Sequence, residues 1–147
     1  MIRQQLTEAQ KDSWVFQNTD LRPSEVSRSP YCPSDIMTDL KLQFADGIFT
    51  AYNVEFDFGM YLSKDPYDWH PHLAPCIMET ARELLGVDRW LKAQEAYDTF
   101  CEGNPAHVPD GVEEHRALSD AVFEGHILLG MVELYDEVEE LYREVLE

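Results

Sequence analysis

Hydrophobic and polar positions alternate most clearly between residues 37 and 58. Leu40, Leu42 and Phe44 are separated by polar residues, and after Gly47 the alternation resumes with one apolar and one acidic face. A period of two residues is typical of half-buried β-strands, and a glycine between two such runs suits a tight turn. The pattern predicts an antiparallel β-hairpin over about residues 37–58.

Helical spacing replaces this alternation further along the chain. Apolar residues from Ile77 to Leu84 recur every three or four positions, and Gly86 follows as a stop signal. A second apolar stripe, with Asp88 as its candidate N-cap, runs on and ends before Gly103. The short link between the two stripes predicts an antiparallel or bent pair of helices.

The last predicted helix is the longest, because no proline interrupts the sequence after Pro109. Asp110 is its candidate N-cap, and Glu113 stands in the capping-box position three residues later. Gly125 and Gly130 weaken the middle of this helix and predict a bend or a close helix contact there.

A hydrophobic seam with the 4, 3, 4, 3, 4 spacing of heptads follows Gly125. Its members are Ile127, Met131, Leu134, Val138, Leu141 and Val145. Such a stripe either packs into the core of its own domain or pairs with a second copy of the chain. The spacing leaves both uses open, core and homodimer interface.

The whole chain, 1–147, has the length of one compact domain. Residues 1–34 predict a short helix followed by a loop rich in proline and serine. The hairpin occupies residues 35–60 and the helical part residues 75–147. The predicted fold class is therefore α+β, with a hairpin layer packed on three or four helices and a long acidic C-terminal helix.

The net charge of the sequence indicates which kind of partner to expect. The sequence has 29 acidic residues against 11 Lys and Arg, a formal net charge of −18, and residues 106–147 hold 12 of the acids with 2 bases. A surface this negative repels DNA, RNA and anionic lipid, and it attracts a basic protein. We therefore expect a basic protein partner, and neither direct nucleic-acid binding nor membrane binding.

The acids of the last helix fill almost every polar position around the seam, with Arg143 as the one opposing base. They are Glu133, Asp136, Glu137, Glu139, Glu140 and Glu144. Ordinary solvated helix faces mix both signs of charge, since like charges four residues apart are destabilising. This one-sided distribution predicts that the six acids form a partner-binding surface.

The spacing of these acids invites comparison with nucleic acid. A helix over residues 111–147 would be roughly 55 Å long and carry 11 acids, or one per about 5 Å, against about 3.4 Å per phosphate of a DNA strand. Two such helices, or one helix supplemented by Glu55 and Asp57 of the hairpin, would approach the phosphate spacing.

These observations favour a non-enzymatic inhibitor or decoy that blocks a basic, nucleic-acid-handling enzyme or complex. The analogy with anti-restriction and anti-CRISPR proteins rests on size and charge. The alternative of the same general kind is an immunity or antitoxin-type protein that neutralises a toxic enzyme. In both cases the function is binding, and the two differ in which site of the partner is covered.

An enzymatic alternative depends on one ligand set. His70, His72 and Cys76 offer imidazole and thiolate donors suited to zinc, yet their spacing matches no established zinc motif. Cys101 and His107 are a further Cys/His pair close in sequence, considered as a nucleophile and its base, and no oxyanion hole accompanies them. Phosphate-binding glycine loops are absent. We therefore predict no catalytic residues, no metal and no cofactor.

Cysteine usage and the start of the sequence bear on location. Three cysteines make an odd number without the spacing of a disulfide framework. The first ten residues have no apolar stretch of the kind that directs secretion, and the longest apolar neighbourhood is too short to cross a bilayer. The chain is predicted to be cytoplasmic, with reduced thiols.

Overall fold

The computed structural model describes residues 3–101 and 117–145. Over these residues the chain is mostly helical, with eight α-helices, one π-helix and a two-stranded parallel sheet. An α+β description remains compatible with this arrangement, but the predicted antiparallel hairpin is wrong. No helix in the described part of the chain is long and apolar enough to span a membrane.

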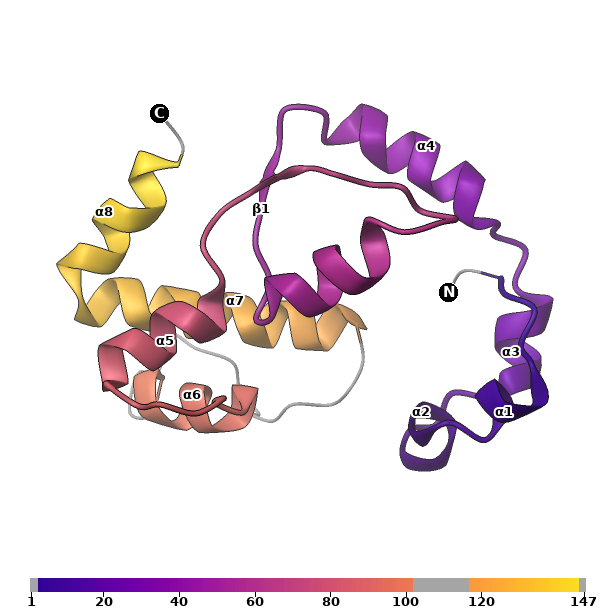
Figure 1. Cartoon of the computed structure of the whole chain (residues 1–147), viewed down its shortest axis with the longest axis horizontal. Helices are drawn as coiled ribbons and strands as arrows, with labels where there is room; N and C mark the ends of the chain where they lie inside the picture. Colours follow the sequence, from indigo (N-terminus) through magenta and orange to yellow (C-terminus); the bar gives the residue numbers. More distant parts are fainter. Residues whose placement is uncertain (1–2, 102–116, 146–147) are drawn as a thin grey trace.

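Three short helices open the described chain: α1 (Glu8–Lys11), α2 (Trp14–Asn18) and α3 (Pro23–Arg28). They lie at one end of the longest axis, and α8 lies at the other (Figure 1). The predicted proline-rich loop is thus partly helical. Proline lacks the backbone donor, which is unused at the first position of a helix, so Pro23 begins a helix instead of preventing one.

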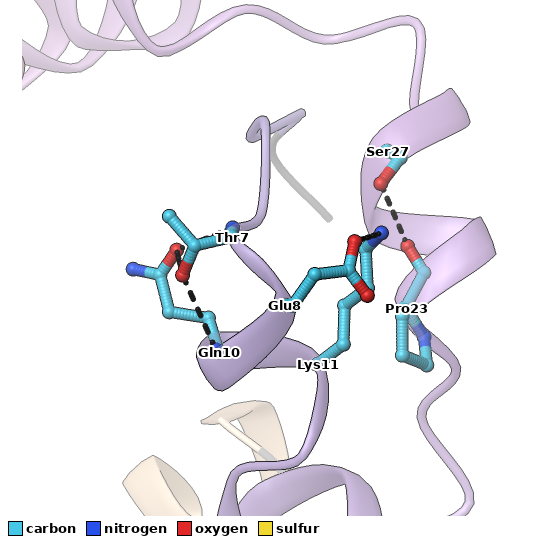
Figure 2. Close-up of polar contacts among 6 residues, drawn as sticks. All are labelled: Thr7, Glu8, Gln10, Lys11, Pro23 and Ser27. Atoms are coloured by element: carbon cyan, nitrogen blue, oxygen red, sulfur yellow. Dashed lines mark hydrogen bonds and ion pairs between the residues drawn. The ribbon is translucent and has the colours of Figure 1, made fainter.

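Local hydrogen bonds hold these short helices. A capping box closes α1: the Thr7 hydroxyl accepts from the backbone N–H of Gln10 at 3.3 Å, and the Gln10 side chain accepts from the N–H of Thr7 at 2.9 Å. Lys11 pairs with Glu8 at 2.7 Å, and Ser27 donates to the carbonyl of Pro23 at 2.9 Å (Figure 2). Each of these contacts stays within one turn.

The first predicted strand is instead the helix α4 (Pro33–Gln43). The apolar alternation was misleading because two of its members do not enter a core: Leu42 is 76% exposed and Phe44 is 42% exposed. Met37, which lay outside the alternation, is the buried residue of this helix. A burial pattern read from the sequence therefore had the wrong period.

The second predicted strand is reduced to β1 (Ile48–Phe49), which pairs in parallel with β2 (His72–Leu73). After a short connection the chain enters the π-helix η1 (Glu55–Leu62), which contains Phe56 and Phe58, two of the apolar residues assigned to the strand. Gly47 does not adopt the left-handed conformation expected of a hairpin turn; among the described glycines Gly86 alone has a positive φ. The hairpin is thereby replaced by a parallel pair with a helical crossover.

Aromatic rings pack against one another beside η1. The Trp69 ring lies 4.8 Å from Phe49 and 5.9 Å from Phe58, measured between centroids, and Phe49 contacts Phe44 edge-on at 6.0 Å. The loop that carries Trp69 is thus held against its own domain.

The predicted pair of helices is present as α5 (Ile77–Leu85) and α6 (Ala93–Phe100). Gly86 ends α5 with a φ of 61°, a left-handed cap that glycine adopts without a steric penalty, as predicted. Asp88 does not cap α6, since Lys92 occupies that position.

The long C-terminal helix is broken in two, α7 (Ala117–Leu134) and α8 (Asp136–Glu144). Tyr135 separates them with an extended backbone, φ −139° and ψ 107°. The predicted cap of the helix, Asp110 with Glu113, lies outside the described residues. The prediction of one long helix is wrong because the extended backbone of Tyr135 turns the chain, and Val138 of α8 is thereby buried in the core.

The core lies where α5, α6, α7 and α8 meet. Gly130 allows the closest approach: a Cβ atom built there would lie 2.7 Å from the carbonyl oxygen of Phe100 in α6. Tyr97 of α6 stacks on Phe123 of α7 with ring centroids 4.5 Å apart. Gly130 therefore marks a close helix contact, whereas a Cβ at Gly125 would meet nothing within 4 Å.

Candidate protein-interaction surface

All six acids predicted to bind a partner are exposed and lie on α8 or just before it. We call this set the acidic face; it comprises Glu133, Asp136, Glu137, Glu139, Glu140 and Glu144. Arg143, the one base in this region, forms an ion pair with Glu139. Both partners of this pair are more than half exposed, so the pair adds little stability, and one positive charge among six carboxylates leaves the surface strongly negative.

The break at Tyr135 changes how these acids are tolerated. It creates a new helix N-terminus, and Asp136, Glu137 and Glu139 lie in the first turn of α8. The partial positive charge of a helix N-terminus favours carboxylates there by a few tenths of a kcal/mol to about 1 kcal/mol each. Three of the six acids thus gain a local compensation that one continuous helix would not have supplied.

The break also shortens and concentrates the charge. The nine residues of α8 extend about 13 Å at about 1.5 Å per residue and carry five acids, or one per about 3 Å. This is close to the phosphate spacing of about 3.4 Å along one DNA strand. In place of the roughly 55 Å acidic helix expected from the sequence, α8 thus presents a short acidic face about as long as four phosphates of a DNA strand.

The seam divides between core and surface. Ile127, Met131 and Val138 are fully buried, at 0%, 0% and 1% exposure, whereas Leu134 is 60% exposed and Leu141 is 38% exposed. Val145 is half-buried. Half of the seam is thus used inside the molecule, and two leucines remain at the surface among the carboxylates.

A groove lies between α5 and α8 beside the acidic face. Its volume is about 420 Å³, and Leu84, Tyr135, Val138 and Leu141 supply its apolar lining. α8 is held in place there by Tyr142, whose hydroxyl donates to the carbonyl of Pro75 at 3.0 Å. Burial raises the pKa of that hydroxyl, which stays protonated and able to donate at neutral pH.

The structure does not assemble the weak zinc set. His70 lies 3.2 Å from Asp68, His72 is an exposed residue of β2, and the Cys76 thiol donates to the carbonyl of Tyr52 at 3.2 Å. Within residues 3–101 and 117–145, no three His, Cys, Asp or Glu side chains gather as a metal site. The alternative of a metal enzyme through His70, His72 and Cys76 thus has no geometric support.

Of the Cys101 and His107 pair, which the sequence did not favour as a catalytic dyad, His107 lies outside the described residues. Cys101 itself is 3% exposed, and its thiol donates to the carbonyl of His126 at 3.3 Å. Burial, with a smaller contribution from the negative charge of Glu133, raises the pKa of this thiol to about 11. At neutral pH it is a buried thiol and not a nucleophilic thiolate.

Sequence reasoning missed a second hollow, between η1 and the first turns of α7. Its volume is about 470 Å³, and Asp57, whose pKa is raised by burial, is among its lining residues. Glu124 on the α7 side accepts a hydrogen bond from the backbone N–H of Tyr52 at 3.1 Å. No sequence signal could have joined these residues, because 72 positions separate Tyr52 from Glu124.

Comparison of the chain with protein-family models, curated proteins and solved structures finds no match.

Proposed function

We propose that this protein is a non-enzymatic, acidic binding protein that blocks a basic, nucleic-acid-handling partner through its acidic face. The observation that carries the proposal is the exposure of all six carboxylates on and beside α8, with one compensating base among them. Long-range attraction would speed the encounter with a basic surface, and charge pairs that lose water in the complex would carry its stability.

The spacing of the charges supports a nucleic-acid partner site in particular. Carboxylates at one per about 3 Å along α8 present a basic groove with a charge density like that of a phosphate strand. The flanking leucines, Leu134 and Leu141, add apolar contact that a nucleic-acid backbone does not offer. A protein that combines both can compete with nucleic acid for the same groove.

The second candidate is an immunity or antitoxin-type protein that covers a different cleft of a toxic enzyme. The same acidic face would serve it, so competition separates the two functions. If the protein is a decoy, an excess of nucleic acid displaces it from its partner. If it acts as an immunity protein at another cleft, the complex survives that excess.

The direct test is affinity capture from a lysate of the cells that produce the protein, at low and at high salt. We expect a basic protein to be captured at low salt by the parent and not by the Glu137→Lys, Glu140→Lys double variant. The matched control is Asp35→Lys with Asp39→Lys, which changes the net charge equally at exposed positions of α4. Equal loss with the control would mean that net charge alone, and not the acidic face, determines binding.

A further inference from the structure

The groove between α5 and α8 has apolar walls and a charged rim. Leu84 of α5 lines it on one side and Val138 and Leu141 of α8 on the other, and Tyr135, between α7 and α8, is also part of the lining. Val138 is buried and fixed in the core, whereas Leu141 is 38% exposed and available for contact. The volume of about 420 Å³ can accommodate one or two large apolar side chains.

Both walls of this groove carry a carboxylate. Glu83 lies on the α5 wall and Glu137 on the α8 wall, and both are exposed members of the lining. No Lys or Arg is among the residues that line it. A segment that enters the groove would therefore lie between two negative charges, which disfavours an acidic occupant and favours one with lysine or arginine on its flanks.

We propose that this groove binds the apolar side of a short, basic amphipathic helix of the partner protein. Grooves between two helices commonly accept a third helix through apolar anchors spaced three or four residues apart. Here the anchors would rest on Leu84 and Leu141, and the basic residues beside them would meet Glu83 and Glu137. The inference rests on the proposed function, and it adds that charge alone does not hold the partner.

Two synthetic peptides of equal positive charge test the inference on the full chain. One is an amphipathic helix with leucine anchors at positions i, i+3 and i+7 among lysines, and the other has alanine in place of every leucine. Calorimetry should show the leucine peptide binding about tenfold or more tightly than the alanine peptide, because burial of a leucine side chain is worth that much. Equal affinities of the leucine and alanine peptides would overturn the proposal that the groove binds apolar anchors.

Two variants distinguish the groove from the acidic face. Leu141→Asp should remove the advantage of the leucine peptide over the alanine peptide, whereas Leu42→Asp on α4, which adds the same charge at a position 76% exposed, should preserve that advantage. Glu137→Lys with Glu140→Lys should weaken both peptides. If this double reversal changes neither peptide, the proposed function fails; if it weakens both while Leu141→Asp leaves the advantage of the leucine peptide intact, the groove alone fails.

Backbone amide shifts give a readout that needs no substitution. On addition of the leucine peptide to the parent, amides of Leu84 and Leu141 should shift at lower peptide concentration than those on the far end at α1 to α3. The alanine peptide should shift the acidic residues of α8 and leave Leu84 unchanged. If the leucine peptide shifts amides along α8 but not that of Leu84, the groove is not its binding site. This result needs only the parent protein, so it holds even if Leu141→Asp fails to fold.

Discussion

At the scale of single residues, Gly130 and Gly125 offer a matched pair. An alanine at Gly130 would force its Cβ against the carbonyl oxygen of Phe100, a backbone atom that cannot move without the helix. We expect overpacking of about 1 to 3 kcal/mol, which exceeds the gain in helix propensity of about 1 kcal/mol. Gly125→Ala, with open space around it, should stabilise the protein by about 0.5 to 1 kcal/mol. Urea unfolding measures both, and a stabilised Gly130→Ala would contradict the close contact.

Cys101 predicts how stability depends on alkaline pH. Burial raises the pKa of its thiol from 9.0 to about 11, so the folded state binds the proton more strongly than the unfolded state does. Stability from this group is complete below about pH 9 and is lost as the pH approaches 11. Burial of Tyr142 raises the pKa of its hydroxyl and adds a loss of the same sign. Urea unfolding between pH 8 and 11 should show this fall, with a shallower slope in Cys101→Ala.

The exposure of the acids on α8 could be predicted from the sequence. Which apolar residues are buried could be predicted only in part. Glu137 and Glu140 are exposed because nothing compensates the cost of burying a charge. Leu134 and Leu42, equally apolar by type, are exposed because of where their helices end and turn. Such positions depend on contacts between distant elements, which the local pattern does not contain.

At the scale of elements, the end of α7 at the break leaves Leu134 at the surface while Met131 stays in the core. Met131 lies before it with 0% exposure, and Leu134, one turn later, is 60% exposed. Met131→Ala should therefore cost about 2 to 5 kcal/mol of unfolding free energy. Leu134→Ala should change it by about 0.5 kcal/mol or less. Denaturant unfolding of the two variants tests this difference. An equal loss of unfolding free energy at both positions would mean that Leu134 is buried too, which would contradict the end of α7 at this residue.

Helices α5 and α6 could be predicted because spacing, length and a glycine stop agree over their residues. The hairpin could not, because the alternation from Leu40 to Phe44 spans only five residues and also fits the end of a helix whose exposed side carries apolar residues such as Leu42 and Phe44. The π-helix η1 has no sequence signature of this kind. It is held by the rings of Phe49 and Trp69 against Phe58, nine and eleven residues away, which no helical or strand spacing brings together.

At the scale of the whole molecule, the seam bears on the oligomeric state. Ile127, Met131 and Val138 are already buried within one chain, which leaves Leu134 and Leu141 at the surface. Two exposed leucines surrounded by carboxylates would bring like charges together in a symmetric dimer. Sedimentation should therefore report a monomer of 17.0 kDa. A species of twice that mass, lost in Leu134→Asp, would assign these leucines to a dimer.

The most direct test of the account is the dissociation constant of the complex with the captured basic partner, measured at low and high salt. The acidic face predicts tight binding by the parent at low salt, a steep loss of affinity as salt is added, and a loss of about 100-fold or more in the Glu137→Lys, Glu140→Lys variant. The melting temperature of that variant should stay near that of the parent, because both side chains are exposed. A double reversal that binds as tightly as the parent at low salt would contradict the account and leave α8 as a solvated helix.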